Sequence, residues 1–145
     1  MQGQYYRLIY HAVWAARMRE PLIDDSLRLK LHKYLHDKVI EYGGTIMAVG
    51  GTDDHVHLVL AMPPQAAPAQ FIGRLKGSSS HWVNHFHNPG GGFAWQGGYG
   101  AFTVADPDLD RVCAYVRNQL QHHQQGTTIA AYEDLTHRNV LCNAR

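Results

Sequence analysis

Two histidines in one short segment are the residues of this sequence best suited to hold a cation. His55 and His57 flank Val56 in HVHLVLA, a run that is typical of a strand. Side chains on a strand alternate between its faces, so both imidazoles point to the same side and can share one divalent metal ion. Two ligands do not complete a site, so a third must come from elsewhere. Asp53 and Asp54 precede the pair, and we take Asp54 as the candidate that orients an imidazole from behind.

A tyrosine late in the chain is the candidate nucleophile. Tyr115 lies beside an apolar stripe at helical spacing, and Gln119 follows one turn later. A free tyrosine has a pKa of about 10, so it needs a base, a positive charge or a metal to become a nucleophile. A metal on His55 and His57 would polarise the phosphate under attack, and Gln119 can lend its carbonyl as a third ligand. Taken alone, a tyrosine at such an edge is more often an amphipathic packing residue.

The elements that must position these residues follow from hydrophobic periodicity and from turn signals. Their order is β-α-β-β-α-β-α, the split βαβ arrangement. We therefore predict an α+β fold, a ferredoxin-like or RRM-like βαββαβ antiparallel sheet with helices on one face, plus a C-terminal helix carrying the tyrosine. The expected strands are 5–15, 45–49, 55–61 and 100–104, and the expected helices run from Asp24 or Asp25 to Gly43, over 68–86 and over 106–123.

Length and composition set limits on the class of protein. The 145 residues suit a single domain, 1–145, in which 126–145 is an appendage without an assignable residue. The formal net charge of +1 is low for a nucleic-acid binder, so DNA contacts must rest on a local patch. The two cysteines are too few for a disulfide framework. Without a bilayer-spanning apolar run or a signal-peptide pattern, we expect a cytoplasmic protein that does not contact a membrane.

Several motifs occur together in an order that resembles a known family. HVHL follows a glycine-rich turn, and then come a Pro-Pro break, a helix with RLKGSSS, an aromatic-Trp-Gln segment and Tyr-x-x-x-Gln in a late helix. The opening YHAVWAARMREPLI fits the same pattern. Over roughly Tyr5 to His123, the sequence resembles the single-tyrosine HUH transposases of the smallest bacterial and archaeal insertion sequences, where HUH denotes two histidines around a hydrophobic residue.

The resemblance implies a mechanism and roles for individual residues. His55 and His57 would bind Mg²⁺ or Mn²⁺, Tyr115 would be the nucleophile and Gln119 the assisting metal ligand. The protein would cut and rejoin single-stranded DNA at hairpin-marked element ends through a 5′-phosphotyrosine intermediate. It would act as a homodimer in which the tyrosine helix of one subunit often completes the site of the other. No ATP would be required, and we find no GxxxxGK[ST] phosphate loop.

Candidate DNA contacts follow from charge, small hydroxyls and aromatic rings. Arginine and lysine supply charge for phosphates, serines allow close approach, and aromatic rings can stack on unpaired bases. A solvated helix face or core packing explains some of these residues equally well. The candidates are Arg17, Arg19, Arg74, Lys76, Ser78, Ser79, Trp95 and Tyr99.

The remaining histidine pairs receive structural interpretations. His81 and His85 have zinc-like spacing without the glutamate of an HExxH motif, so we interpret them as packing or surface residues. His122 and His123 lie near the end of a helix, where a partly cationic imidazole is favourable.

Two other functions remain open at this point. One is a host-domesticated, palindrome-associated tyrosine transposase that still cuts DNA. The other is a non-catalytic ferredoxin-like module that binds nucleic acid through stacked aromatic residues. In the second case GGYGAFTV would be a loose version of an RRM strand motif that lacks its basic start. A covalent protein–DNA adduct distinguishes the enzyme from the binding module.

Overall fold

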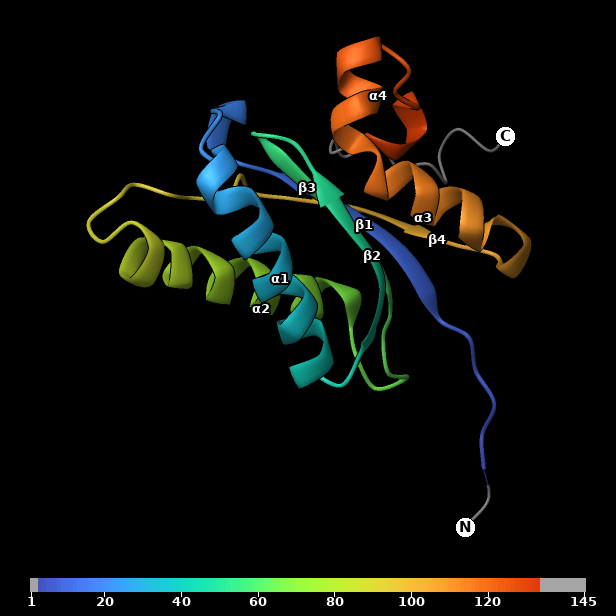
Figure 1. Ribbon diagram of the computed structural model, residues 1–145. Coiled ribbons are helices and arrows are strands. Elements are labelled where there is room, and N and C mark those ends of the chain that lie inside the picture. Colours follow the sequence, from blue (N-terminus) through green and yellow to red (C-terminus); the bar gives the residue numbers. More distant parts are fainter. Residues whose placement is uncertain (1–2, 134–145) are drawn as a thin grey trace.

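A four-stranded antiparallel sheet organises the computed structural model, which describes residues 3–133 (Figure 1). The strand order is β2-β3-β1-β4, with every neighbouring pair antiparallel. This order is the split βαβ arrangement, so the predicted ferredoxin-like α+β fold is confirmed. The strands are β1 (Ile9–Ala15), β2 (Thr45–Gly51), β3 (His55–Ala61) and β4 (Gly100–Thr103), and the helices are α1 (Asp25–Glu41), α2 (Pro68–Trp82), α3 (Leu109–Arg117) and α4 (Gln119–Gln125).

The first two helices cover one face of the sheet and form the larger core with it. Asp24 caps α1 by accepting a 2.9 Å hydrogen bond from the backbone N–H of Leu27. Gly43, with φ of 88°, follows its end in the left-handed conformation. The buried side chains of this apolar face include Trp14 from β1, Leu31 and Leu35 from α1, Leu58 and Leu60 from β3, and Ile72 and Leu75 from α2.

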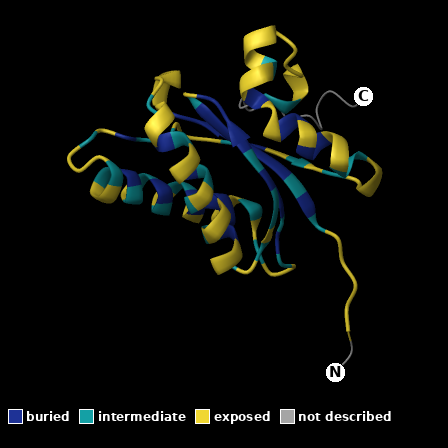
Figure 2. Cartoon of the chain, viewed as in Figure 1, coloured by how far each residue is buried: buried dark blue, intermediate teal, exposed yellow. Residues whose placement is uncertain are grey.

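The opposite face carries α3 and a smaller apolar cluster (Figure 1). Val112, Cys113 and Val116 of α3 pack on Ile9 of β1 and Val59 of β3. Cys113 is thus a small core residue. Since two core clusters share one sheet, the buried residues follow the strands through the centre of the molecule and the exposed ones line the outer helical surfaces (Figure 2). Among the described residues, no helix has the length and apolar content needed to cross a bilayer.

The prediction of one continuous helix over 106–123 is wrong. A 3-10 turn at Asp106–Asp108 precedes α3, and Asn118, with φ of −104° and ψ of 25°, separates α3 from α4. Leu120, whose spacing from Val116 continues the apolar stripe beside Tyr115, is 39% exposed after this break. The stripe therefore ends one turn earlier than its periodicity indicated.

Two other element boundaries differ from the predictions. The first strand begins at Ile9 rather than Tyr5 because its partner strand β3 ends at Ala61, which pairs with Ile9. The helix predicted over 68–86 is α-helical only to Trp82 and continues as a π-helical turn, Val83–His87. That turn leaves Phe86, whose spacing from Trp82 places it on the same face of the predicted helix, 73% exposed.

Candidate active site

The histidine pair lies on the α3 face of the sheet, at one end of β3. His55 and His57 alternate with Val56 and Leu58, whose side chains enter the core under α1 and α2. Opposite His57, β2 contributes Gly50. A Cβ atom at that position would overlap the carbonyl oxygen of Val116, so only glycine allows α3 to approach the sheet so closely. The alternation predicted for the pair is confirmed, and a close helix covers it.

Each imidazole is oriented through its Nδ1 atom. His55 Nδ1 lies 2.6 Å from Asp54 Oδ1 and 2.9 Å from Thr52 Oγ1. His57 Nδ1 lies 2.8 Å from Nε2 of His11, a buried residue of β1 whose ring stacks on that of His57. Burial lowers the pKa of His11 to about 3, with a smaller contribution from His57, so His11 is neutral and its Nε2 can accept a hydrogen bond from the N–H at His57 Nδ1. Both Nε2 atoms are thereby left to face α3 and α4.

Tyr115 and Gln119 meet this pair from the junction of α3 and α4. The rings of Tyr115 and His57 lie with centroids 6.1 Å apart, and the Tyr115 side chain is buried. Gln119 Oε1 lies 3.2 Å from His55 Nε2 and 3.1 Å from His123 Nε2. The four residues that the sequence singled out as nucleophile and metal ligands therefore come together in one chain.

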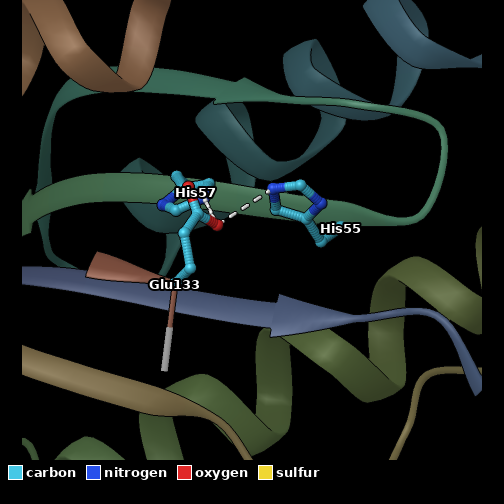
Figure 3. Close-up of side chains that lie close together, drawn as sticks. All are labelled: His55, His57 and Glu133. Atoms are coloured by element: carbon cyan, nitrogen blue, oxygen red, sulfur yellow. Dashed lines mark hydrogen bonds and ion pairs between the residues drawn. The ribbon is translucent and has the colours of Figure 1, made fainter. Parts of the chain in front are cut away.

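Glu133 joins the same cluster from the C-terminal segment, where the sequence offered no assignable residue. Gly126 ends α4 with φ of 68°, and the chain returns through a 3-10 turn, Ala130–Tyr132. Figure 3 shows the Glu133 carboxylate pointing at both imidazoles of β3. Its Oε2 atom lies 3.1 Å from His57 Nε2 and 3.4 Å from His55 Nε2, while Oε1 accepts a 2.5 Å hydrogen bond from the Tyr115 hydroxyl.

The charges of the cluster depend on these contacts. Burial disfavours protonation of His55, but hydrogen bonds to Asp54 and Glu133 outweigh it and raise its pKa to about 9. At His57 burial prevails and lowers the pKa. Burial opposes ionisation of Glu133, yet hydrogen bonds with His55 and His57 hold its pKa well below the usual range. Burial and the bond to Glu133 raise the pKa of Tyr115, so the phenol is protonated beside an ionised carboxylate.

The donor set fits a divalent cation. His55, His57 and Glu133 each offer one ligand atom, and these atoms lie within 4.8 Å of one another. Gln119 Oε1 adds a neutral oxygen next to His55 Nε2. Imidazole nitrogens with carboxylate and amide oxygens suit several divalent metals.

The candidate DNA contacts fall into two groups. Arg17 and Arg19 lie in the 3-10 turn after β1, whose last residue, Ala15, pairs with His55. Arg19 has a left-handed φ of 57°, and its guanidinium lies 3.9 Å from the Asp54 carboxylate. These two arginines are therefore near the histidine end of β3.

The other six candidates belong to the α2 side of the sheet. Arg74 lies over the ring of Tyr42 with 3.8 Å to the centroid, and Lys76 donates to the carbonyls of Gln96 and Gly98. The backbone carbonyl of Ser78 accepts from the Tyr34 hydroxyl, and Ser79 is fully buried and accepts from Trp95 Nε1. Tyr99 packs partly buried against the core. These side chains make intramolecular contacts on the face opposite the histidine pair, and their role in DNA binding stays a prediction.

Sequence reasoning missed several residues that contact the cluster, among them four titratable ones. His11 could be found only from the register of β1 against β3. His122 stacks on Tyr115 with ring centroids 4.7 Å apart, and His123 contacts Gln119 at helical i, i+4 spacing. That spacing was a usable signal, whereas the helix-end interpretation overlooked it. Nothing local marks Glu133, because a single carboxylate after a glycine has no pattern.

Comparison with known proteins identifies similar sequences and structures. The sequence model of the family described as "Transposase IS200 like" matches residues 4–119. The ISDra2 transposase TnpA of Deinococcus radiodurans is 27% identical over 123 residues, which is 81% of this chain and 88% of that protein. The transposase of insertion sequence element IS200 from Salmonella typhimurium is 27% identical over 128 residues, 83% of this chain and 82% of that protein.

Two solved structures share the fold. A crystal structure described as that of a transposase from Deinococcus radiodurans superimposes with a TM-score of 0.64 at 30% identity, covering 82% of this chain and 95% of that one. A REP-associated tyrosine transposase bound to a REP hairpin superimposes with a TM-score of 0.60 at 13% identity, covering 88% of this chain and 76% of that one. The second likeness, at such low identity, concerns the fold alone.

Proposed function

This chain belongs to the IS200-like transposase family, and from that membership we propose that it cuts and rejoins single-stranded DNA with Tyr115 as nucleophile. One observation carries the proposal. The Glu133 carboxylate accepts a hydrogen bond from the Tyr115 hydroxyl and also lies 3.1 Å from His57 Nε2, so the phenol and the imidazole pair face one small volume. A phosphate in that volume would meet both groups.

The reaction proposed for Tyr115 is a transesterification. The phenol loses its proton, its oxygen bonds to phosphorus, and the bond from phosphorus to the 3′ oxygen breaks. The 3′ oxygen takes up a proton, and the 5′ end remains as a phosphotyrosine. In the reverse direction a 3′ hydroxyl attacks the phosphotyrosine and the phenol regains its proton. Each exchange conserves one phosphoester bond, so no nucleotide hydrolysis is required.

A divalent cation, Mg²⁺ or Mn²⁺, belongs to this proposal. His55 Nε2, His57 Nε2 and Gln119 Oε1 would hold it. When bound, the cation polarises the phosphate and stabilises the developing charge, a contribution of several kcal/mol. Asp54 and His11 act on the other side of the two imidazoles, where each fixes the orientation of a ring.

The substrate proposed is single-stranded DNA with a hairpin at the ends of an insertion sequence. The curated relatives from insertion sequences support this choice, and a tyrosine transposase that shares the fold was solved bound to a REP hairpin. Arg17 and Arg19, beside the histidine end of β3, are the first candidates for phosphate contacts. We further propose a homodimer in the cytoplasm, in which either subunit can supply the α3–α4 unit to a site.

The direct test is a covalent adduct. The protein is incubated with single-stranded DNA carrying its hairpin and Mn²⁺, and a denaturation-resistant adduct is expected. Tyr115→Phe should abolish it, whereas Tyr132→Phe, whose ring lies against Tyr115, should still form it. Adduct formation by Tyr115→Phe would remove that residue from the role.

Mixing two inactive proteins tests how sites are assembled. Tyr115→Phe retains the histidine pair, and His57→Ala retains the nucleophile. If active sites are shared between subunits, the mixture should regain adduct formation. A mixture that stays inactive under conditions of subunit exchange would contradict shared sites and favour assembly within one chain, as the geometry of this structure has it.

A further inference from the structure

The C-terminal segment 127–133 lies over the nucleophile. The Tyr115 hydroxyl accepts a 3.0 Å hydrogen bond from the backbone N–H of Ile129 and donates to Glu133. The ring of Tyr132 packs edge-on against those of Tyr115 and His11, with centroids 5.3 and 5.2 Å apart. Under this cover Tyr115 is only 4% exposed and His57 is 0% exposed. A DNA phosphate can reach either group only after the segment moves.

We propose that Glu133 is a direct ligand of the divalent cation in the DNA-free protein, so that the bound cation latches the segment 127–133 over Tyr115. The inference rests on the proposed function, because it presumes a cation on the histidine pair. It adds a carboxylate ligand to that site and gives the C-terminal segment a role. When DNA binds, one of its phosphate oxygens replaces the Glu133 oxygen on the cation, and the segment 127–133 is released from Tyr115.

The spacing of the donor atoms supports a shared cation. At metal–ligand bond lengths of about 2.1 Å, neighbouring ligand atoms are about 3.0 Å apart in an octahedron and about 3.4 Å apart in a tetrahedron. Glu133 Oε2 lies 3.1 Å from His57 Nε2 and 3.4 Å from His55 Nε2. Gln119 Oε1 lies 3.2 Å from His55 Nε2. These three separations match those of neighbouring ligands around one ion.

The charge of the ligands also supports Glu133 as a ligand of the cation. Two neutral imidazoles and one amide carry no negative charge, whereas hard cations such as Mg²⁺ and Mn²⁺ prefer carboxylate oxygens. The Asp54 carboxylate contacts Nδ1 of His55, on the far side of the ring. Among the described residues, Glu133 is the carboxylate that reaches the Nε2 side of both histidines. Without Glu133, the ion would gain a negatively charged ligand on this side only when a DNA phosphate binds.

The experiment measures cation binding without DNA. Mn²⁺ is titrated calorimetrically into the full-length protein and into Glu133→Gln, Glu133→Ala, His57→Ala and Glu41→Gln. Glu41 is an exposed carboxylate at the end of α1, paired with Lys38, and serves as the matched control. We expect both Glu133 variants to bind Mn²⁺ at least about tenfold more weakly. Glu41→Gln should bind as the wild type does, and His57→Ala should lose binding.

Hydrogen exchange provides the second readout, on the latch itself. Mn²⁺ should slow exchange of the backbone amides in 127–133, including that of Ile129, in the wild type but not in Glu133→Gln. Glu133 lies in a short segment outside both apolar core clusters, so its two variants should fold, which circular dichroism checks.

The possible failures are distinguishable. If Glu133→Gln and Glu133→Ala bind Mn²⁺ as tightly as the wild type while His57→Ala does not, Glu133 is only an ion-pair partner of the histidines and the latch is overturned, with the proposed cation site intact. If His57→Ala also binds normally, or if the wild type takes up no Mn²⁺ without DNA, the latch fails because no cation occupies the cluster before DNA arrives.

Discussion

The two faces of β3 have opposite chemistry at adjacent positions. Leu58 and Leu60 point into an apolar core under α1 and α2, whereas His55 and His57 point into a cluster of imidazoles, amide and carboxylate under α3 and α4. Both sets are buried to a similar extent. Burial of leucine is favourable by about 25 cal/mol per Å² of apolar surface, while buried polar groups cost free energy unless they are hydrogen-bonded.

This difference separates folding from chemistry within one strand. The apolar face forms the larger core, which stabilises the sheet. The polar face is satisfied by contacts that converge on a small volume, and its outer wall includes a short segment, 127–133, beside α3 and α4. We therefore expect substitutions on the apolar face to lower mainly the free energy of unfolding, and substitutions on the polar face to lower mainly the rate of adduct formation.

The largest effect is expected from His57→Ala. The variant removes a cation ligand whose contribution of several kcal/mol corresponds to a loss of roughly a thousandfold or more in the rate of DNA adduct formation. Because His57 contributes little apolar burial, the free energy of unfolding should change by less than about 2 kcal/mol. Adduct formation within about tenfold of the wild-type rate would contradict the division between the faces.

The neighbouring variant Leu58→Ala should show the reverse pattern. Leu58 is 0% exposed, and its truncation leaves a cavity between the sheet and its helices, which costs about 2–5 kcal/mol of unfolding free energy. Urea unfolding measures this loss. At a temperature where the variant is fully folded, its adduct rate should stay near that of the wild type. A folded but inactive Leu58→Ala protein would show that the two faces are coupled.

Gly50→Ala tests the close approach of α3 to the sheet. The added methyl group meets the Val116 carbonyl and forces the helix outward, at a cost of about 1–3 kcal/mol in unfolding free energy. Tyr115 and Gln119 move with α3 and α4, so the adduct rate should fall as well. The control is Gly73→Ala on α2, where a Cβ meets nothing within 4 Å. In that helix the change should stabilise by up to about 1 kcal/mol and leave the adduct rate unchanged.

The smallest effect is expected for His11, which orients His57 from behind. His11→Phe keeps the ring and removes the nitrogen, so Mn²⁺ affinity should fall about 10–100-fold without loss of the fold. His11→Gln places an amide near the position of Nε2 and should recover part of the affinity. A purely structural role would give the opposite order, with phenylalanine tolerated better than glutamine.

Much of the architecture could be predicted from local patterns. Apolar residues recur every fourth position on α1, and their register determines which face is buried, as it does on β3. The breaks were harder to predict. Asn118 interrupts a sequence with helical periodicity on both sides, and Phe86 leaves its expected face because the last turn of α2 is π-helical. Such departures depend on tertiary packing, which overrides local propensity.

The sequence by itself determined the histidine pair, the tyrosine, the glutamine one turn later and the order of elements, because these depend on strand and helix periodicity over a few residues. Only the tertiary structure decided that His11 and Glu133 join them. The register of β1 against β3 brings His11 to His57, and the reversal after Gly126 returns Glu133 to the histidines. Contacts between residues so far apart in the chain leave no periodic trace in one sequence, since they depend on how the elements pack rather than on their spacing.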